Sequence, residues 1–239
     1  MKEVTTSLLL LALAGCAEGG SLMAASATSA AGVLEDKPVL TGRVLDAAGA
    51  PQSDVLVEAF GFGMDQSPVT LQNGQTALIF ISGATLAPRA FDRRILGYVP
   101  PGAKTDADGR FTIALPARGT YNLEAVATAE LKGWRYKVDA SASALPVGDL
   151  TLRETAVLKG RITMPEDKGS KEGADVYLAG SPYHARTEAD GSYRFEKVPA
   201  GTVDVVAFKG NLKSKAICID VVPGGETVAP DAPMAVVAP

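Results

Sequence analysis

The sequence predicts an all-β protein that contains two tandem copies of one β-domain. Short runs rich in β-branched and aromatic residues alternate with Gly, Pro, Asp and Asn at turn positions, as in residues 55–59, 111–115 and 121–126. Period-two alternation bounded by turn residues is typical of half-buried antiparallel strands. No long stretch of the sequence keeps helical spacing, and many short strands at close spacing indicate a sandwich or a barrel.

The N-terminus has the pattern of an export signal that ends at a cysteine. Lys2 supplies a minimal positive start, residues 8–13 form a short apolar run, and small residues lead to Cys16. So short a run cannot cross about 30 Å of hydrocarbon as a helix. The pattern resembles the lipobox of bacterial lipoproteins, in which the cysteine becomes the mature N-terminus and carries acyl chains. We therefore expect residues 1–15 to be a signal peptide and Cys16 to be lipidated; the alternative is an ordinary signal peptide with an incidental cysteine.

The segment after the cysteine predicts a tether to the membrane. Residues 16–37 are rich in Ala, Gly and Ser and lack periodicity, which is typical of a flexible linker. Ala17 stands where an aspartate would favour retention in the inner membrane, so the resemblance to Gram-negative lipoproteins implies sorting to the outer membrane. With Cys16 acylated, Cys218 has no partner for an intrachain disulfide, and its apolar strand-like surroundings predict a buried, inert thiol.

An internal repeat divides the rest of the chain into two copies. Four blocks recur in the same order: residues 40–44 with 158–162, 54–57 with 175–178, 104–111 with 186–193, and 115–120 with 198–202. The repeat predicts one domain over residues 38–153, a second over 156–229, and a flexible tail at 230–239.

The first copy carries an insertion that the second copy lacks. It covers residues 61–103 and contains a predicted strand at 76–81 after an Asn73-Gly74 turn. Long insertions are more often functional than decorative. A basic patch follows the strand, and its members are Arg89, Phe91, Arg93 and Arg94. We expect this patch to contact a partner protein or an anionic envelope polymer; the alternative is that the arginines are solvated or pair with Asp92 and nearby acids.

The repeated blocks carry a resemblance to a known family. A Gly-Arg-Val strand, an Asp-Val-Leu-Val strand, Thr-Asp-Ala-Asp-Gly-Arg-Phe and Leu-Pro-Ala-Arg-Gly-Thr-Tyr follow one another in residues 42–121. This order is similar to that of the carboxypeptidase regulatory-like domain. The resemblance implies a transthyretin-like, Greek-key β-sandwich for each copy and says little about function, because such domains are non-catalytic parts of many exported proteins. The second copy departs from the family pattern at 164–173 and at Val203, where the family usually has Tyr.

Residues that often carry chemistry have structural explanations in this sequence. Asp106 and Asp108 precede Gly109 as in a hairpin turn, and Arg110 and Phe111 follow where a calcium loop needs another carboxylate. His184 is the single histidine, so a multi-histidine zinc site is excluded and we expect it to have a routine structural role. No Gly-x-Ser-x-Gly elbow occurs. We therefore expect no catalytic residues, no metal and no cofactor.

Trp134 and Tyr136 lie two residues apart, so a strand would direct both rings to one face. If that face is exposed, the rings can stack on sugars; if it is covered, they pack in the core or on the seam between the domains. A net charge of −4 and a pI near 5.1 exclude a nucleic-acid partner, which needs clustered basic residues. The sequence thus predicts an envelope lipoprotein with a binding or scaffolding role. Carbohydrate binding, and an accessory role beside an envelope enzyme or secretion assembly, remain the alternatives.

Overall fold

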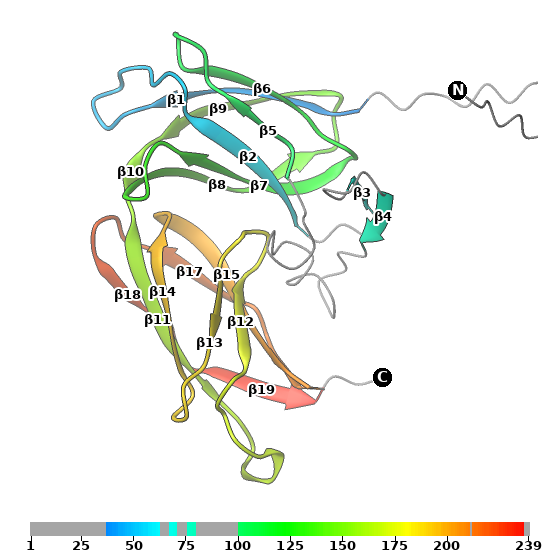
Figure 1. Ribbon diagram of the computed structural model, residues 1–239, viewed down its shortest axis with the longest axis vertical. Helices are drawn as coiled ribbons and strands as arrows, with labels where there is room; N and C mark the ends of the chain where they lie inside the picture. The colour runs from blue at the N-terminus through cyan, green and yellow to red at the C-terminus, as the bar shows by residue number, and fades with distance from the viewer. Residues whose placement is uncertain (1–36, 63–66, 71–75, 80–99, 211, 237–239) are drawn as a thin grey trace, which may run out of the picture. The chain divides into compact units, whose positions relative to one another are not determined.

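The computed structural model describes residues 37–62, 67–70, 76–79, 100–210 and 212–236, and Asp36–Pro239 form one compact unit (Figure 1). Within these ranges the chain is almost wholly β, with one short 3-10 turn, η1 (Glu166–Lys168). It folds as two tandem Greek-key β-sandwiches, as the sequence predicts. No helix in the described residues is long and apolar enough to span a membrane.

The first sandwich consists of two sheets that share no strand. Its strands are β1 (Val39–Leu45), β2 (Leu56–Phe62), β5 (Gly102–Lys104), β6 (Arg110–Ala114), β7 (Gly119–Val126), β8 (Leu131–Ala140), β9 (Ala144–Thr151) and β10 (Arg153–Glu154). One sheet has the order β6-β1-β9, in which β1 and β9 run parallel, and the other has the order β10-β8-β7-β2-β5 (Figure 1). The first and last long strands of the copy are therefore hydrogen-bonded neighbours, which closes the domain on itself.

The second sandwich repeats this order. Its strands are β11 (Ala156–Thr163), β12 (Asp175–Leu178), β13 (His184–Arg186), β14 (Ser192–Val198), β15 (Gly201–Lys209), β16 (Leu212–Ser214), β17 (Ile217–Val221), β18 (Glu226–Val228) and β19 (Ala232–Val236). The run β14-β11-β18 corresponds to β6-β1-β9, and β13-β12-β15-β17 corresponds to β5-β2-β7-β8. The prediction of two copies of one β-domain is confirmed by this matching order.

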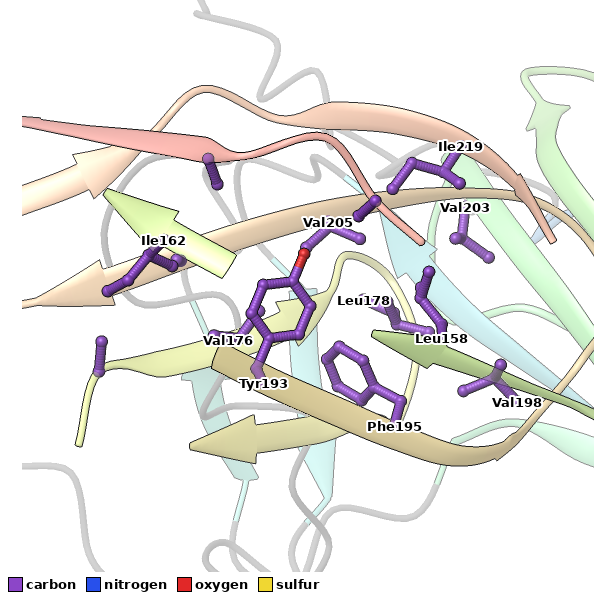
Figure 2. Close-up of a cluster of buried hydrophobic side chains, with 14 of the residues drawn as sticks. Leu158, Ile162, Val176, Leu178, Tyr193, Phe195, Val198, Val203, Val205 and Ile219 are labelled. Atoms are coloured by element: carbon purple, nitrogen blue, oxygen red, sulfur yellow. The ribbon is translucent and has the colours of Figure 1, made fainter. Parts of the chain in front are cut away.

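Each sandwich has its own hydrophobic core. One cluster of buried side chains comes from residues 40–152 and the other from residues 156–234. Figure 2 shows the second core, where the rings of Tyr193 and Phe195 pack edge to face with centroids 5.8 Å apart. Alternation explains the clusters: in β14, for example, Tyr193 and Phe195 are buried and Arg194 between them is exposed.

An aromatic ring covers a glycine on the neighbouring strand in both copies. Gly42 of β1 is the register partner of Phe111 in β6, and Gly160 of β11 is the partner of Tyr193 in β14. A Cβ on Gly42 would lie 2.6 Å from Cζ of Phe111, so the ring occupies the space that a side chain would need. This packing explains why the repeated Gly-Arg and Asp-Gly-x-aromatic blocks occur together.

The repeated Thr-Asp/Glu-Ala-Asp-Gly block forms a hydrogen-bonded turn. Oγ1 of buried Thr105 accepts a hydrogen bond from the Val55 amide at 2.9 Å and donates one to the Gln52 carbonyl at 2.7 Å. Asp106 Oδ1 accepts hydrogen bonds from the amides of Asp108 and Arg110, at 2.9 and 2.8 Å. The turn interpretation of these aspartates is therefore confirmed, because the carboxylate satisfies its own backbone.

Thr187 makes the equivalent contacts in the second copy. These contacts change which residues of the two copies correspond in one of the repeated blocks. Its Oγ1 accepts from the Ala174 amide at 2.8 Å, as Thr105 accepts from Val55. Asp54 therefore corresponds to Gly173 and not, as the repeat predicts, to Asp175. The difference is two residues, so each side chain stays on the same face of the strand. The shifted register places Val57 and Val176, both fully buried, at equivalent positions.

The domain limits predicted from the sequence differ from the strands at two places. The prediction of a flexible tail at 230–239 is wrong for Ala232–Val236, which form strand β19 and pair with β16. Ala232 and Met234 are buried and alternate with exposed residues, which is the pattern of a half-buried strand. The segment predicted as an insertion, 61–103, contains the start of β5, which pairs with β2 as β13 pairs with β12. β3 (Ser67–Thr70) and β4 (Thr76–Ile79) form an antiparallel hairpin within this segment, and β4 begins where the strand is predicted.

Candidate functional site

The face of β8 that carries Trp134 and Tyr136 contacts the second sandwich. The Trp134 indole N–H donates to the Thr202 carbonyl at 2.8 Å, and the Tyr136 hydroxyl donates to Asp204 Oδ2 at 2.7 Å. Thr202 and Asp204 are themselves two residues apart in β15, so a pair on one strand meets a pair on the other. We call this contact region the junction; it consists of these residues together with Asn122, Glu124, Lys132, Lys137, Ala179, Gly180 and Tyr183.

The rings of Trp134 and Tyr136 share one face, as the sequence predicts, and that face is covered. Trp134 is partly buried and packs against the core of the second sandwich. A Cβ on Gly201 would approach its Cδ1 to 3.3 Å. The structure thus places both residues on the seam between the domains, which is the packing alternative from the sequence. Sugar stacking on these two rings would require the junction to open.

The side-chain amide of Asn122 in β7 makes hydrogen bonds to both sandwiches. The side chain is fully buried, and its Nδ2 donates to the carbonyls of Ala179 and Gly180 at 3.1 and 2.9 Å. Its Oδ1 accepts from the Lys137 amide at 2.8 Å, where β8 has a positive φ of 48°. A buried amide must satisfy both donors and its acceptor, and these bonds do so. Asn122 therefore fixes the position of the 179–180 backbone relative to β7.

Glu124 is a buried acid with one ammonium and one phenol beside it. Its side chain is almost fully buried, its Oε1 accepts a hydrogen bond from the Tyr183 hydroxyl, and Lys132 Nζ lies 3.4 Å away. Lys132 Nζ also donates to the Lys197 carbonyl at 3.0 Å. Burial raises the pKa of Glu124 above its ordinary value, although Lys132 and Tyr183 act to lower it. Burial, and then the charge of Glu124, raises the pKa of the Tyr183 phenol, which therefore stays protonated.

Asp204 is the second buried acid of the junction. It accepts from Tyr136 as described, and Lys137 Nζ lies 3.1 Å from the same oxygen. Burial, followed by Asp204, raises the pKa of Tyr136 far above the ordinary range for a phenol. Lys137 is 41% exposed, so solvent weakens its attraction to Asp204, and the hydrogen bond from Tyr136 is the contact that requires one placement of β8 against β15. The junction is therefore suited to fix how the two sandwiches are oriented.

Cys218 does not lie where the sequence predicts. Its register partner in β15 is Asp204, and its side chain is exposed. The prediction of a buried thiol is wrong. Ile219 and Val221 face the core from β17, and Cys218, one residue before Ile219, points to the opposite face of the strand.

His184 has a local partner in the outer sheet of the second sandwich. Its Nε2 lies 3.0 Å from Asp175 Oδ1, and its ring lies 4.6 Å from that of Tyr177. Burial acts to raise the pKa of Asp175, but the hydrogen bonds and charges of His184 and Arg186 together lower it below its ordinary value. In the described part of the chain, no three His, Cys, Asp or Glu side chains gather where they could hold a metal ion.

Other predicted site residues lie outside the described residues. These are Cys16 and the basic patch of Arg89, Phe91, Arg93 and Arg94. Conversely, four buried or partly buried residues of the junction are not predicted from sequence patterns: Asn122, Glu124, Lys132 and Tyr183. The available signal was that β7 carries polar residues at alternate positions, which reads as an exposed face when a second domain is not considered.

Comparison with known proteins gives structural likeness only. No protein-family model and no curated protein matches the chain. It is similar to a type II cohesin–X-dockerin complex chain from Acetivibrio cellulolyticus, with 21% identity over 34% of this chain and a TM-score of 0.27. It is also similar to the Bacillus anthracis TIE protein (12% identity over 83% of this chain, TM-score 0.30). A third likeness is to the minor pilin GBS52 of Streptococcus agalactiae (12% identity over 84% of this chain and 98% of the pilin, TM-score 0.32).

The chain spans 58% of the cohesin–X-dockerin chain and 34% of the TIE protein. Likeness at these TM-scores carries no argument about function, so the fold class rests on the strand order described above.

Proposed function

We propose that this protein is a lipid-anchored component of the cell envelope whose tandem sandwiches have a non-catalytic binding or scaffolding role. The junction carries the scaffolding part of this proposal. Trp134, Tyr136 and Asn122 each donate from the first sandwich to the second. Hydrogen bonds in a buried setting resist rotation of one domain on the other, because breaking them leaves polar groups unsatisfied. A fixed tandem holds its outer surfaces at a constant separation, as a scaffold requires.

Both sandwiches are proposed to be carboxypeptidase regulatory-like domains. The shared strand order and the matching Thr105 and Thr187 contacts support a common origin for the two copies. In the first copy, Tyr121 donates to the Ala117 carbonyl at 2.8 Å across the Pro-x-x-Gly-Thr-Tyr turn. The second copy has Val203 at this position, and its turn from Pro199 to Gly201 is one residue shorter.

The lipid anchor on Cys16, and with it an outer-membrane location, is the localisation part of the proposal. Two or three acyl chains contribute about 0.8 kcal/mol for each buried CH₂, which is enough to hold the protein at a bilayer. The test is Cys16→Ser expressed in the native host. We expect the variant to leave the membrane fraction or to accumulate uncleaved. Retention in carbonate-washed membranes at the wild-type level would contradict the anchor.

The binding part of the proposal concerns the insertion and its basic patch. Arginine suits carboxylate or phosphate groups because its planar fork binds them in a bidentate way. A deletion should cover 64–99 and leave Phe62 and Gly102–Lys104, because those residues belong to β2 and β5. Envelope proteins and polymers crosslinked to wild type should be lost from both the deletion and the Arg89/Arg93/Arg94→Ala variant. If both variants keep the same crosslinks and the same melting temperature, the insertion is not the binding element.

A further inference from the structure

Two buried acids face each other on neighbouring strands of the first sandwich. Glu58 of β2 and Glu124 of β7 are direct register partners, and their exposed fractions are 8% and 2%. Like charges directly opposite each other destabilise a sheet. Two carboxylates in one buried site also hold a proton more readily than either alone. Placing two acids opposite each other in a buried site therefore lowers the stability of the sandwich.

The second copy has uncharged residues at the positions equivalent to these two acids. The positions equivalent to Glu58 and Glu124 are Tyr177 and Val206, which are register partners in β12 and β15. Both are 6% exposed, so this uncharged pair is also buried. The acid pair is thus specific to the first copy and is not required by the sandwich. It occurs on the face that meets the second sandwich at the junction.

The groups that face Glu124 come from three elements of the described chain. Glu58 comes from β2, Lys132 from β8, and Tyr183 from the segment between β12 and β13. Tyr183 belongs to the second sandwich, and its hydroxyl bonds to the Glu124 carboxyl while Lys132 Nζ lies 2.6 Å from the same hydroxyl. The protonation of Glu124 is therefore coupled to a contact between the two sandwiches.

We propose that the Glu58–Glu124 pair makes the association of the two sandwiches depend on pH, so that uptake of one proton by Glu124 tightens the junction. When the sandwiches separate, Glu124 becomes solvated and returns to ordinary carboxylate behaviour. The docked state then binds the proton more strongly than the undocked state, and docking is favoured as the pH falls.

The pH window follows from the direction in which the pKa of Glu124 moves. This pKa is raised from its ordinary value of 4.5, first by burial and further by the charge of Glu58. The stabilisation is complete below pH 4.5 and is lost as the pH rises through the raised pKa. Each tenfold gain in the proton affinity of the docked state strengthens docking by up to about tenfold. Glu130, bonded to Lys197 across the junction at 2.8 Å, has a lowered pKa and acts with the opposite sign at more acidic pH.

The single tryptophan is a reporter within the junction. Trp134 is the only Trp in the chain, so its indole N–H gives one NMR signal, and that N–H bonds to Thr202. We expect its chemical shift to titrate with a midpoint above 4.5, the ordinary value for Glu. Glu124→Gln should abolish the step, and Glu58→Gln should move it to lower pH. The matched control Glu130→Gln removes an exposed carboxylate of the first sandwich that bonds to Lys197 of the second, and it should leave the midpoint unchanged.

A direct titration keeps the proposal testable if a variant does not fold. The carboxyl ¹³C signal of Glu124 in the wild-type protein should titrate above pH 4.5, and it should move together with the Trp134 indole signal. A Glu124 midpoint at or below that value would overturn the proposal. So would an indole step that persists unchanged in Glu124→Gln.

Discussion

Replacing Thr105 by Val tests the physical role of the repeated turn block. The change keeps the shape of a 6% exposed side chain and removes its hydroxyl. The Val55 amide loses an acceptor at 2.9 Å, and the Gln52 carbonyl loses a donor at 2.7 Å. An unsatisfied buried polar group costs about 1–3 kcal/mol, so the two together should lower the free energy of unfolding by about 2–6 kcal/mol.

Thermal melts followed by circular dichroism measure this loss. For a protein of this size, 1 kcal/mol shifts the melting temperature by about 2–4 °C, so we expect a fall of about 4 °C or more. Thr105→Ser keeps the hydroxyl and is the matched control, with a loss of about 1 kcal/mol for the methyl group. Thr187→Val should repeat the effect in the second sandwich, where the hydroxyl bonds to the Ala174 amide and the Lys171 carbonyl. A Thr105→Val melt within 1–2 °C of wild type (~0.5 kcal/mol) would refute the reasoning.

Three further predictions concern single residues and the second sandwich. Tyr193→Phe should raise the free energy of unfolding by about 1 kcal/mol, because the Tyr193 hydroxyl is buried without a hydrogen-bond partner among the described residues; a clear loss in urea titrations would contradict this. Burial raises the pKa of Tyr121 to about 12, so its contribution to stability is complete below about pH 10 and declines as the pH rises toward 12. The melting temperature of Tyr121→Phe should therefore fall less between about pH 10 and 12 than that of wild type. An equal fall in both proteins would argue against this role of Tyr121. Residues 156–236, which include β19, should fold alone as a β-domain with a cooperative melt, and a fragment that ends at 229 should be less stable because β11 and β16 lose a partner; equal melts would show that β19 adds nothing.

The strands and the repeat could be predicted from the sequence because both depend on local patterns. Alternation of apolar residues places the core-facing side chains of β6 and β14, and the Asp-Gly turns precede those strands. Matching blocks then imply the same strand order twice. The two-residue difference at Asp54 and Asp175 arises because the sequence match follows similar residues, whereas the hydrogen bonds of Thr105 and Thr187 define the register.

The junction could not be predicted because it depends on contacts between distant parts of the chain. Asn122 and Glu124 occupy the outward positions of β7, which pattern reasoning assigns to solvent. They are buried because the second sandwich covers them, and their bonding partners lie 57 to 59 residues further along the chain. Trp134 and Tyr136 were found from their spacing, but whether their shared face was open or covered required the structure.

The proposed scaffolding role requires a fixed junction, and residual dipolar couplings test directly whether the junction is fixed. Amide couplings should be measured for both sandwiches in one weakly aligned sample. We expect a single alignment tensor to fit strands of residues 39–151 and 156–236 together, because the hydrogen bonds of Trp134, Tyr136 and Asn122 hold one sandwich on the other. Two tensors of different magnitude would mean that the sandwiches move independently and would contradict the scaffold.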